Sequence, residues 1–561
     1  MIFDQPRALI AAAVLCFCLA SAAGVRAAEV YPGCAEPGPI GHVWYVDPVN
    51  GKTPADGGDG SKAAPWNSLQ GVVGSAKQPG YSRPMLSTIP YDHAQLNAEG
   101  KRLYADGPSN DPSRVQPGDE ILLMSGQYGD VSIGIYGASA TNPAFVTIAA
   151  APGQTPVLAT LTLSPAIMWR FQHLSVQSLT KNPGRSRAIL VYDRGPAFPT
   201  SDIIFESMVV GSPDKVDDWT RAQWIANAHW IGFATTSSPG GPNTKCVSFT
   251  GGTIYGARFG VNLFSDNSIF SHNTIDHFGD DALDYAASNL IIADNYVHDN
   301  YDLADGNHPD CMQGFLGPIN RATAPKNPKG APYTAYSNVV IERNRCIRQT
   351  DPNLKYPFSL QGIDAFNSDW TNLTVANNVV VTSSCWGIGY ASVHGGKIIN
   401  NTVLDDGSNV GTKNAAGNIM CRPWIAVGAE SHEGLTSNDV IVRNNIGVAY
   451  RMNSVGPSVT MDHNICLAID GTCQIIDSRG GKVKVDSKPG RYGDHNIIER
   501  RGAAAMFVGF DPAKFAFDVS LKSGSAAIGA GNPAGAPAAD IARTPRGSRI
   551  DIGAYQYPPG K

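Results

Sequence analysis

Acidic and amide side chains fall at matching positions of five short apolar segments in the middle of the chain. The segments are GVNLF (260–264), DALDY (281–285), CMQGF (311–315), GIDAF (362–366) and GIGYA (387–391). If these segments pair as parallel strands, side-chain alternation places their apolar residues on one face and the neighbouring residues on the other. The second face then collects a column of five residues: Asn262, Asp284, Gln313, Asp364 and Gly389. The turns before these strands add four polar side chains: Asp280, Asp281, His308 and Asp310.

Carboxylates on neighbouring strands, which lie about 4.8 Å apart, can do two kinds of chemistry. Like charges at that separation repel each other unless a cation neutralises them or some of the carboxyl groups hold protons. Neutralisation by a cation gives a hard-oxygen site suited to Ca²⁺. Protonation gives the paired acid and base with which glycosidases cleave a sugar bond. His308, with an ordinary pKa of about 6.5, is suited to proton transfer in the same cluster.

The strands that position these residues belong to a repeat. Apolar-alternating segments each end in an asparagine-centred step, and the shorter spacings between steps are about 20–24 residues, a period typical of a β-solenoid. Stacked coils bury an apolar core that one coil cannot form alone. Asparagine is expected at the bends because it tolerates left-handed backbone and its amides can bond along the stack. The series consists of Asn273, Asn295, Asn344, Asn377, Asn401, Asn444 and Asn464.

Five segments stand out near the two ends of the chain: YVDPVNG (45–51), GDGSKAAPWNSLQ (58–70), VQPGDEILLMSGQYGD (115–130), LKSGSAAIGAG (521–531) and DIGAYQY (551–557). They resemble segments of secreted right-handed parallel β-helix enzymes that act on polysaccharides. The resemblance implies an all-β fold, a right-handed parallel β-helix (β-solenoid) with loop insertions and a short N-terminal cap that contains a helix near 66–76. It also implies one domain over 28–561, with the cap and first coils at 40–130, central coils with the candidate site at 257–470 and a closing segment at 515–561.

The run DDALD (280–284) resembles the DDxxD motif of polysaccharide lyase family 9, the calcium-dependent pectate lyases. The resemblance implies that Asp280, Asp281 and Asp284 bind Ca²⁺ and that the substrate is a uronate-containing polysaccharide. The resemblance does not extend to the catalytic base. The family's proton-abstracting lysine corresponds to Gln313 here, and an amide cannot remove a proton.

Two reactions therefore remain open, with a polysaccharide lyase slightly favoured over a glycoside hydrolase. In the lyase, a positive charge lowers the pKa of the uronate C5 proton and His308 is the expected base. In the hydrolase, Asp284 and Asp364, about 9–10 Å apart across two coils, suit an inverting pair, whereas Asp281 and Asp310 suit a retaining pair. A uronan epimerase is a third interpretation, although the Asp-Pro-His-Asp motif of those enzymes is absent. A non-catalytic carbohydrate-binding surface protein is the alternative outside enzymes.

Substrate contacts are expected from the same face and from the loops beside it. Gln313 and Asn262 face outward from their strands, and the Gln313 amide can hydrogen-bond a sugar hydroxyl. Long loops on a solenoid build its binding wall, and the insertion 348–358 places Lys355 to meet the carboxylates of an acidic polymer. Tyr390 is a candidate for stacking on a sugar ring. Further candidates for proton transfer are Tyr285, Lys355 and His394.

The first 27 residues are predicted to be a secretory signal peptide. Arg7 precedes the apolar stretch 8–23, and Val25-Arg26-Ala27 fits a small-residue cleavage site. We expect the protein to be secreted or periplasmic, without a membrane span, because this stretch is short for a bilayer. Export permits disulfides among the remaining cysteines, of which Cys466 and Cys473 form the best local pair.

Composition limits the classes of partner. The chain has 561 residues, of which 16% are charged, compared with about 25% in average globular proteins. This composition excludes a coiled coil and a disordered chain. The net charge of −5 and the lack of a basic stripe exclude a nucleic-acid-binding surface. We expect a monomer whose partner is a polysaccharide.

Overall fold

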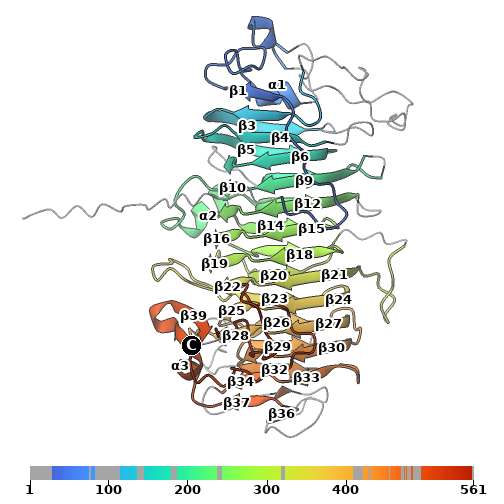
Figure 1. The fold of residues 1–561 in the computed structure, drawn as a ribbon, viewed down its shortest axis with the longest axis vertical. Coiled ribbons are helices and arrows are strands. Elements are labelled where there is room, and N and C mark those ends of the chain that lie inside the picture. The colour runs from blue at the N-terminus through green and yellow to red at the C-terminus, as the bar shows by residue number, and fades with distance from the viewer. Residues whose placement is uncertain are drawn as a thin grey trace, which may run out of the picture.

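Short parallel strands stack coil upon coil along the length of the molecule (Figure 1). The structure is a computed structural model that describes residues 28–74, 78–81, 114–134, 144–177, 186–196, 198–236, 243–317, 323–408, 421–428, 431–453, 455–468, 473, 475–476, 482–483 and 495–558. The strands form three parallel ladders, and the fold is the predicted right-handed parallel β-helix. The predicted signal peptide, 1–27, lies outside the described residues.

Each ladder takes one strand from successive coils. The first ladder contains β1 (Val43–Val46), β2 (Glu120–Leu123), β4 (Val146–Ala150), β6 (Ile167–Gln172), β9 (Thr200–Glu206), β12 (Thr244–Thr250), β15 (Ser268–Ser271), β18 (Leu290–Ala293), β21 (Ala335–Glu342), β24 (Asp369–Ala376), β27 (Val393–Ile399), β30 (Asn438–Arg443) and β33 (Thr460–Asp462). The second ladder contains β7 (Ser175–Gln177), β10 (Val209–Gly211), β13 (Thr253–Tyr255), β16 (Thr274–Phe278), β19 (Tyr296–Asn300), β22 (Arg345–Ile347), β25 (Val379–Thr382), β28 (Thr402–Asp405), β31 (Ile446–Gly447), β34 (Ile465–Leu467) and β37 (Ile497–Glu499). The third ladder contains β3 (Gly126–Ile133), β5 (Pro156–Leu163), β8 (Arg187–Tyr192), β11 (Ile231–Thr236), β14 (Phe259–Leu263), β17 (Leu283–Tyr285), β20 (Asp310–Gly314), β23 (Gln361–Ala365), β26 (Trp386–Tyr390), β29 (Trp424–Val427), β32 (Ala449–Met452) and β35 (Ile475–Ile476).

The remaining elements are short and lie at the ends or in loops. The 3-10 helix η1 (Pro54–Asp56) and helix α1 (Leu69–Val73) belong to the N-terminal cap, and α1 confirms the helix expected near 66–76. Ser68 caps α1 because its side chain accepts a hydrogen bond from the Gly71 N–H. Helix α2 (Arg221–Asn227) lies in the loop between β10 and β11. The chain then adds β36 (Lys482–Val483), α3 (Ala503–Met506), and a hairpin of β38 (Phe507–Asp511) and β39 (Ala516–Leu521) around η2 (Pro512–Lys514).

The core runs along the inside of the three ladders. On the third ladder, Val261 pairs with Leu283 and Met312 pairs with Ile363, which in turn pairs with Ile388. All five side chains are fully buried. Burial of each such side chain stabilises the fold by about 1.5–3 kcal/mol, and alternation then fixes which residues face outward.

A stack of buried asparagine amides turns the chain from the first ladder into the second. The amide Oδ1 of each asparagine accepts hydrogen bonds from the backbone N–H and the Nδ2 of the preceding member. The members are Asn273, Asn295, Asn344, Asn378, Asn401, Asn445, Asn464 and Asn496. The predicted members Asn377 and Asn444 are therefore wrong by one residue. They are buried as well, but they precede the paired asparagines and hold the left-handed backbone of the turn, with φ of 55° and 54°.

A second, more exposed asparagine stack does combine left-handed backbone with amide pairing. Asn289 donates from Nδ2 to Asn267 Oδ1 at 2.8 Å, Asn338 donates to Asn289 at 2.9 Å, and Asn372 donates to Asn338 at 2.7 Å. All four have φ between 54° and 59°. In the exposed stack one asparagine has both properties, whereas in the buried stack left-handed backbone and amide pairing fall on adjacent residues.

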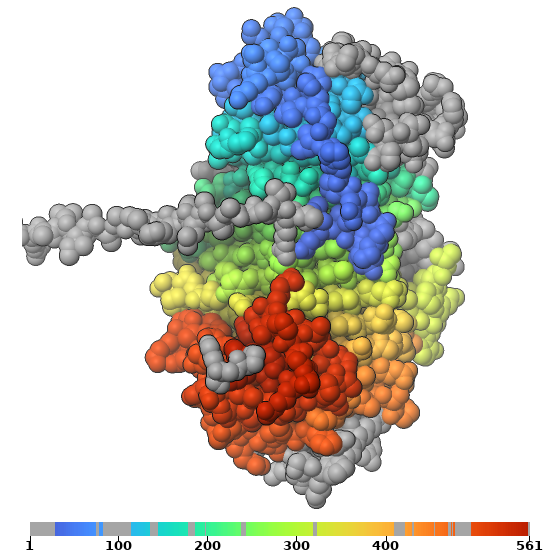
Figure 2. All heavy atoms as spheres, viewed as in Figure 1, coloured from blue at the N-terminus to red at the C-terminus, as the bar shows by residue number. Residues whose placement is uncertain are grey.

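Both ends of the described chain run along the outside of the coils (Figure 2). Near the N-terminus, Cys34 forms a disulfide with Cys246, and the Ala35 N–H donates to Asp202. Residues beyond β39 run back along the stack, where Gly553 N–H donates to the Asn444 carbonyl and Asn377 Nδ2 donates to the Ala539 carbonyl. The C-terminal segment covers apolar side chains on the outer face of the second ladder, including Val379, Leu404 and Ile446.

All eight cysteines among the described residues are paired. The disulfides join Cys34 to Cys246, Cys311 to Cys346, Cys385 to Cys421, and Cys466 to Cys473, the last of which confirms the predicted local pair. Disulfides persist in oxidising compartments, which fits an extracellular protein. In the described part of the chain, no helix is both long enough and apolar enough to cross a membrane.

Candidate functional site

The outward face of the third ladder carries the predicted column of residues. Asn262 pairs with Asp284, Asp284 with Gln313, Gln313 with Asp364, and Asp364 with Gly389. The register derived from the sequence is therefore confirmed for this face. Successive members lie on adjacent strands, about 4.8 Å apart along the stack.

The turns before these strands bring a second row of carboxylates to the same face. The Asp310 N–H donates to Asp281 Oδ1 at 2.9 Å, and the Ala282 N–H donates to the Asp310 carbonyl at 2.8 Å. Asp281 and Asp310 therefore lie side by side on adjacent coils, as their positions in the aligned segments predict.

The carboxyl groups are buried although they point away from the core. Asp310 and Asp364 have no exposed surface, and Asp284 is 7% exposed. Among the described residues, no N–H or hydroxyl donates to Asp284 Oδ1, Asp310 Oδ1 or either oxygen of Asp364. Buried acceptors without a donor cost about 1–3 kcal/mol each, and more when charged. Protons or a bound cation would satisfy these oxygens.

Burial and mutual repulsion raise the pKa values of these carboxyls. Burial, with the charge of Asp310, raises the pKa of Asp284 to about 8. Burial raises the pKa of Asp364 well above its ordinary value, and the like charge of Asp310 raises it further. The pKa of Asp281 is also raised well above its ordinary value, by burial and by the neighbouring Asp284 and Asp310. Without a cation, several of these groups hold protons at neutral pH.

His308 is the solvent-facing member of the site. Its side chain is 67% exposed, and its Nδ1 lies 3.2 Å from Asp310 Oδ2. The hydrogen bond to Asp310 raises the pKa of His308. Gln313 Nε2 also donates to Asp310 Oδ2, at 3.0 Å. Asp310 therefore orients both the His308 imidazole and the Gln313 amide.

Arg258 is a site residue that the sequence patterns did not reveal. Its guanidinium Nη2 pairs with Asp280 Oδ2 at 3.1 Å and with Asp305 Oδ2 at 2.6 Å, and its Cζ lies 4.3 Å from the centre of the Trp230 ring. Burial still raises the pKa of Asp280 to about 6, with Arg258 opposing the shift. Arg258 lies 22 residues before Asp280, about one short coil, and that spacing is the signal that could have revealed the pair.

Two predicted substrate contacts lie elsewhere. Tyr390 is fully buried inside the helix, where its hydroxyl lies 2.7 Å from the hydroxyl of Tyr285, so it presents no surface for a sugar ring. Side-chain alternation along the strand explains this placement, because Tyr390 lies two residues after Ile388, whose side chain points inward. Lys355 Nζ donates to the Asp218 carbonyl at 3.1 Å, on the segment that leads into α2. Asn262 and Gln313 are placed with the carboxylates.

A second group of titratable side chains lies on the second ladder. Asp276, His298 and Asp299 place potential metal-binding atoms within 4.8 Å of one another. Both oxygens of Asp299 already accept hydrogen bonds, from the N–H and hydroxyl of Thr350 and the N–H of Asp351. These bonds, with His298, lower the pKa of Asp299 to about 2 against the effect of burial. Asp299 is therefore bound into a hydrogen-bonded network, unlike Asp364, neither of whose oxygens has a donor among the described residues.

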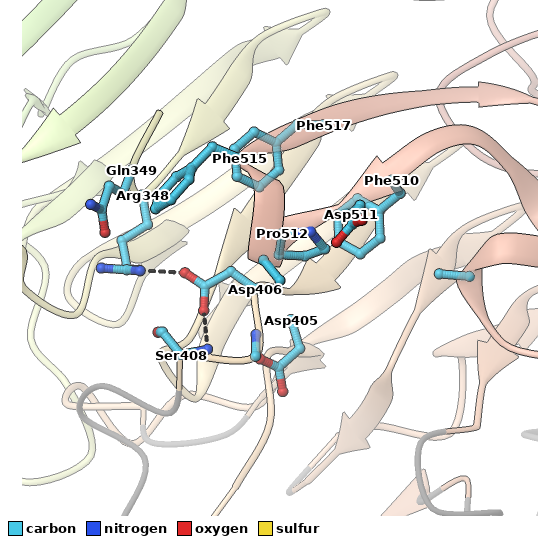
Figure 3. A pocket seen from close by; sticks show the side chains of 13 residues that line it. Arg348, Gln349, Asp405, Asp406, Ser408, Phe510, Asp511, Pro512, Phe515 and Phe517 are labelled. Atoms are coloured by element: carbon cyan, nitrogen blue, oxygen red, sulfur yellow. Dashed lines mark hydrogen bonds and ion pairs between the residues drawn. The ribbon is translucent and has the colours of Figure 1, made fainter. Parts of the chain in front are cut away.

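A hollow of about 610 Å³ lies apart from the carboxylates, between the ends of β22 and β28 and the β38–β39 hairpin (Figure 3). Phe510 and Phe517 line one side. On the other, Arg348 Nε donates to Asp406 and Arg422 pairs with Asp405 at 2.8 Å. Its charged groups are already paired, so the third-ladder face remains the candidate active site.

The oxygen atoms on this face are suited to bind a hard cation. Asp284, Asp310 and Asp364 offer buried carboxylate oxygens that no hydrogen-bond donor satisfies among the residues described, and Asn262 Oδ1 is in the same condition. Oxygen ligands of this kind suit Ca²⁺. Asp280 shares this property only in part, because its Oδ1 lacks a donor whereas its Oδ2 pairs with Arg258.

No protein-family model and no curated protein sequence matches the chain. Among solved structures, pectate lyase Pel9A is 13% identical, over 94% of this chain and 98% of that one, with a TM-score of 0.35. The PL6 family polysaccharide lyase Pedsa3628 from Pseudopedobacter saltans is 12% identical, over 78% and 95%, with a TM-score of 0.34. The GH136 lacto-N-biosidase from Eubacterium ramulus is 11% identical, over 82% and 68%, with a TM-score of 0.27. Likeness at this level concerns the fold and does not choose a reaction.

Proposed function

We propose that this protein is a secreted polysaccharide-cleaving enzyme that acts on a uronate-containing glycan at the third-ladder carboxylates. The observation that carries the proposal is the set of buried, unsatisfied carboxylate oxygens of Asp284, Asp310 and Asp364 beside the exposed His308. Buried like charges destabilise a fold, so their concentration on one outer face marks a functional site. Export through the signal peptide at 1–27 fits the four disulfides.

The favoured reaction is calcium-assisted β-elimination. Asp284, Asp310 and Asp364, with Asp281 beside them, would hold the Ca²⁺. When bound, the ion would neutralise the uronate carboxylate and so acidify the C5 proton. Asp280 would remain paired with Arg258 and shape the site from outside the ligand set.

The chain's own residues would orient the sugar and move the proton. His308 is exposed and hydrogen-bonded through Nδ1 to Asp310, which leaves Nε2 free to face a sugar and accept the C5 proton. Its raised pKa favours the protonated form, so proton abstraction would be faster at mildly alkaline pH. The Gln313 amide would hydrogen-bond a sugar hydroxyl beside it.

Hydrolysis is the second candidate, and one observation favours it. Asp284 and Asp364 lie two coils apart and both have raised pKa values, so one can hold a proton at neutral pH while the other is ionised. Such a pair could act as general acid and general base at the wider, inverting separation.

One experiment separates the two reactions. The purified protein is incubated with polygalacturonate and with alginate, while ultraviolet absorbance and new reducing ends are both recorded. Elimination creates an unsaturated uronate end that absorbs, so rising absorbance together with new ends supports the lyase. New ends with flat absorbance would establish the hydrolase. The absence of new ends across a panel of uronate polymers would contradict the proposed function.

A further inference from the structure

His308 lies near the end of a loop, 301–309, whose own backbone does not hold it in place. Between Leu303 and His308, no backbone group bonds another backbone group in the part of the chain that the structure describes. All residues of 304–308 except Asn307 are exposed. A segment with few buried contacts and no backbone pairing opens easily. The position of the His308 imidazole therefore depends on side-chain contacts with other elements.

The base of this loop is anchored to an insertion that starts three coils earlier. The insertion runs from β10 to β11 and contains α2, and β10 is joined to β19 through β13 and β16 in the second ladder. Trp224 of α2 is fully buried, and its ring centre lies 4.7 Å from that of Tyr301. Leu303 belongs to the same apolar cluster. The insertion thus spans about 14 Å along the stack to reach the loop.

Arg221, the first residue of α2, adds a two-point contact with Asp302. Its Nε donates to the Asp302 carbonyl at 2.8 Å, and its Nη2 donates to Asp302 Oδ2 at 2.6 Å. The Asp302 N–H donates to the Tyr356 carbonyl at 2.8 Å, and the Arg221 Cζ lies 4.5 Å from the centre of the Tyr356 ring. A guanidinium that bonds through two nitrogens fixes the orientation of its partner as well as its distance. Asp302 is therefore held in one orientation at the base of the loop.

Arg258 makes the second charged contact, nearer to His308. Its Nη2 pairs with Asp305 Oδ2 at 2.6 Å and with Asp280 Oδ2 at 3.1 Å, and the Arg258 side chain is 12% exposed. Asp305 lies three residues before His308, so this bridge joins the outer part of the loop to the turn that carries the carboxylates. The loop is thus held at two points by charged side chains.

We propose that the α2 insertion positions His308 for the reaction, with Arg221 acting as a positioning residue through Asp302. This inference rests on the proposed function, in which the His308 imidazole faces the sugar. Arg221 pairs with the base of the loop, so it does not need to touch the glycan to affect the rate. Displacing a reacting group slows the chemical step, whereas the binding of the substrate is affected much less.

The first test compares Arg221→Gln, Asp302→Asn and the double variant with the wild type on polygalacturonate and alginate. We expect each single variant to lower kcat about 10-fold or more, with KM changed less than about 2-fold. The double variant should be no slower than the single variants, because both substitutions remove the same contact. Arg221→Lys should restore part of the rate, since an ammonium group can still pair with the Asp302 carboxylate.

The second test measures the anchor of the loop without any turnover. Limited proteolysis by proteinase K, with the cut sites located by mass spectrometry, should show cleavage within 302–308 several-fold faster in Arg221→Gln than in the wild type. Arg501→Gln is the matched control for both tests, because Arg501 also bonds a carboxylate, that of Glu499, through Nε and Nη2 but lies near the last coil. It should behave like the wild type. Thermal unfolding checks that each variant is folded.

Three results would each overturn the inference: an unchanged kcat in Arg221→Gln, a rise in KM without a fall in kcat, or wild-type proteolysis of its loop. If the wild type cleaves no uronate polymer while the loop of Arg221→Gln is cut faster, the anchoring of the loop stands and the proposed function fails. If the wild type cleaves a polymer and Arg221→Gln matches it in both tests, the proposed function stands and the inference fails.

Discussion

Replacing Asn344 by alanine should destabilise the protein far more than replacing an asparagine of the exposed stack. Asn344 is fully buried, and its side chain makes four hydrogen bonds. Oδ1 accepts from the N–H and Nδ2 of Asn295, at 3.0 and 2.9 Å. Nδ2 donates to the Ile292 carbonyl at 2.9 Å and to Asn378 Oδ1 at 3.0 Å.

The magnitude follows from what the substitution leaves behind. Each hydrogen bond contributes about 1 kcal/mol net, and no water reaches the buried partners to replace it. Asn344→Ala should therefore lower the free energy of unfolding by about 4 kcal/mol. Asn338→Gly is the matched control, because Asn338 also bonds Asn289 and Asn372 but is exposed, and glycine tolerates its φ of 58°. The control should cost less than about 1 kcal/mol because water satisfies the exposed amides.

Urea unfolding followed by circular dichroism measures both variants against the wild type. A shift of the urea midpoint at unchanged slope reports the loss of stability. Equal shifts for the two variants, or a loss below about 1 kcal/mol for Asn344→Ala, would refute the view that buried amide pairing holds the turns of the helix.

Three further outcomes are expected. Asp364→Asn should lower the cleavage rate by at least about 100-fold and leave the protein folded, because the carboxylate serves the reaction and not the stability of the fold. Unchanged turnover would show that Asp364 takes no part in the reaction. Burial lowers the pKa of His229 to about 4, so as the pH falls the unfolded chain binds a proton before the folded chain does. The free energy of unfolding should therefore fall by up to about 3 kcal/mol between about pH 6.5 and pH 4. In urea unfolding, His229→Gln should show a smaller loss over the same pH range. Replacing Cys311 and Cys346 together by alanine opens a loop with a sequence separation of 35 and should cost about 4 kcal/mol in the same assay, whereas a wild-type midpoint would show that the disulfide adds nothing.

The alignment of the third ladder was predictable because two constraints act together. Strand alternation sets the face of each residue, and the repeated apolar residues set the register, so the residue order alone suffices to align Asp284, Gln313 and Asp364. The same alternation places Tyr390 inside the β-helix, because it lies two residues after the inward-facing Ile388. The sugar-stacking role predicted for Tyr390 did not take this alternation into account.

The errors arose where the chain offers two equivalent residues or where contacts depend on loops. Doublets such as Asn377-Asn378 hide which amide joins the stack, since both residues are asparagines, both are buried, and only the coil geometry assigns the pairing to the second. Arg258 approaches Asp280 from the turn of the preceding coil, and strand patterns do not describe turn geometry. The long loop that carries Lys355 packs against the segment before α2, a contact that no local pattern encodes.

The calcium dependence of cleavage tests the central claim most directly. The rate of polygalacturonate or alginate cleavage is measured for the wild type and Asp284→Asn, first in EDTA and then as calcium is restored. The account predicts that the wild-type rate falls to background in EDTA and recovers with calcium, while Asp284→Asn stays slow or needs far more calcium. A full wild-type rate in EDTA would contradict a cation held by the third-ladder carboxylates.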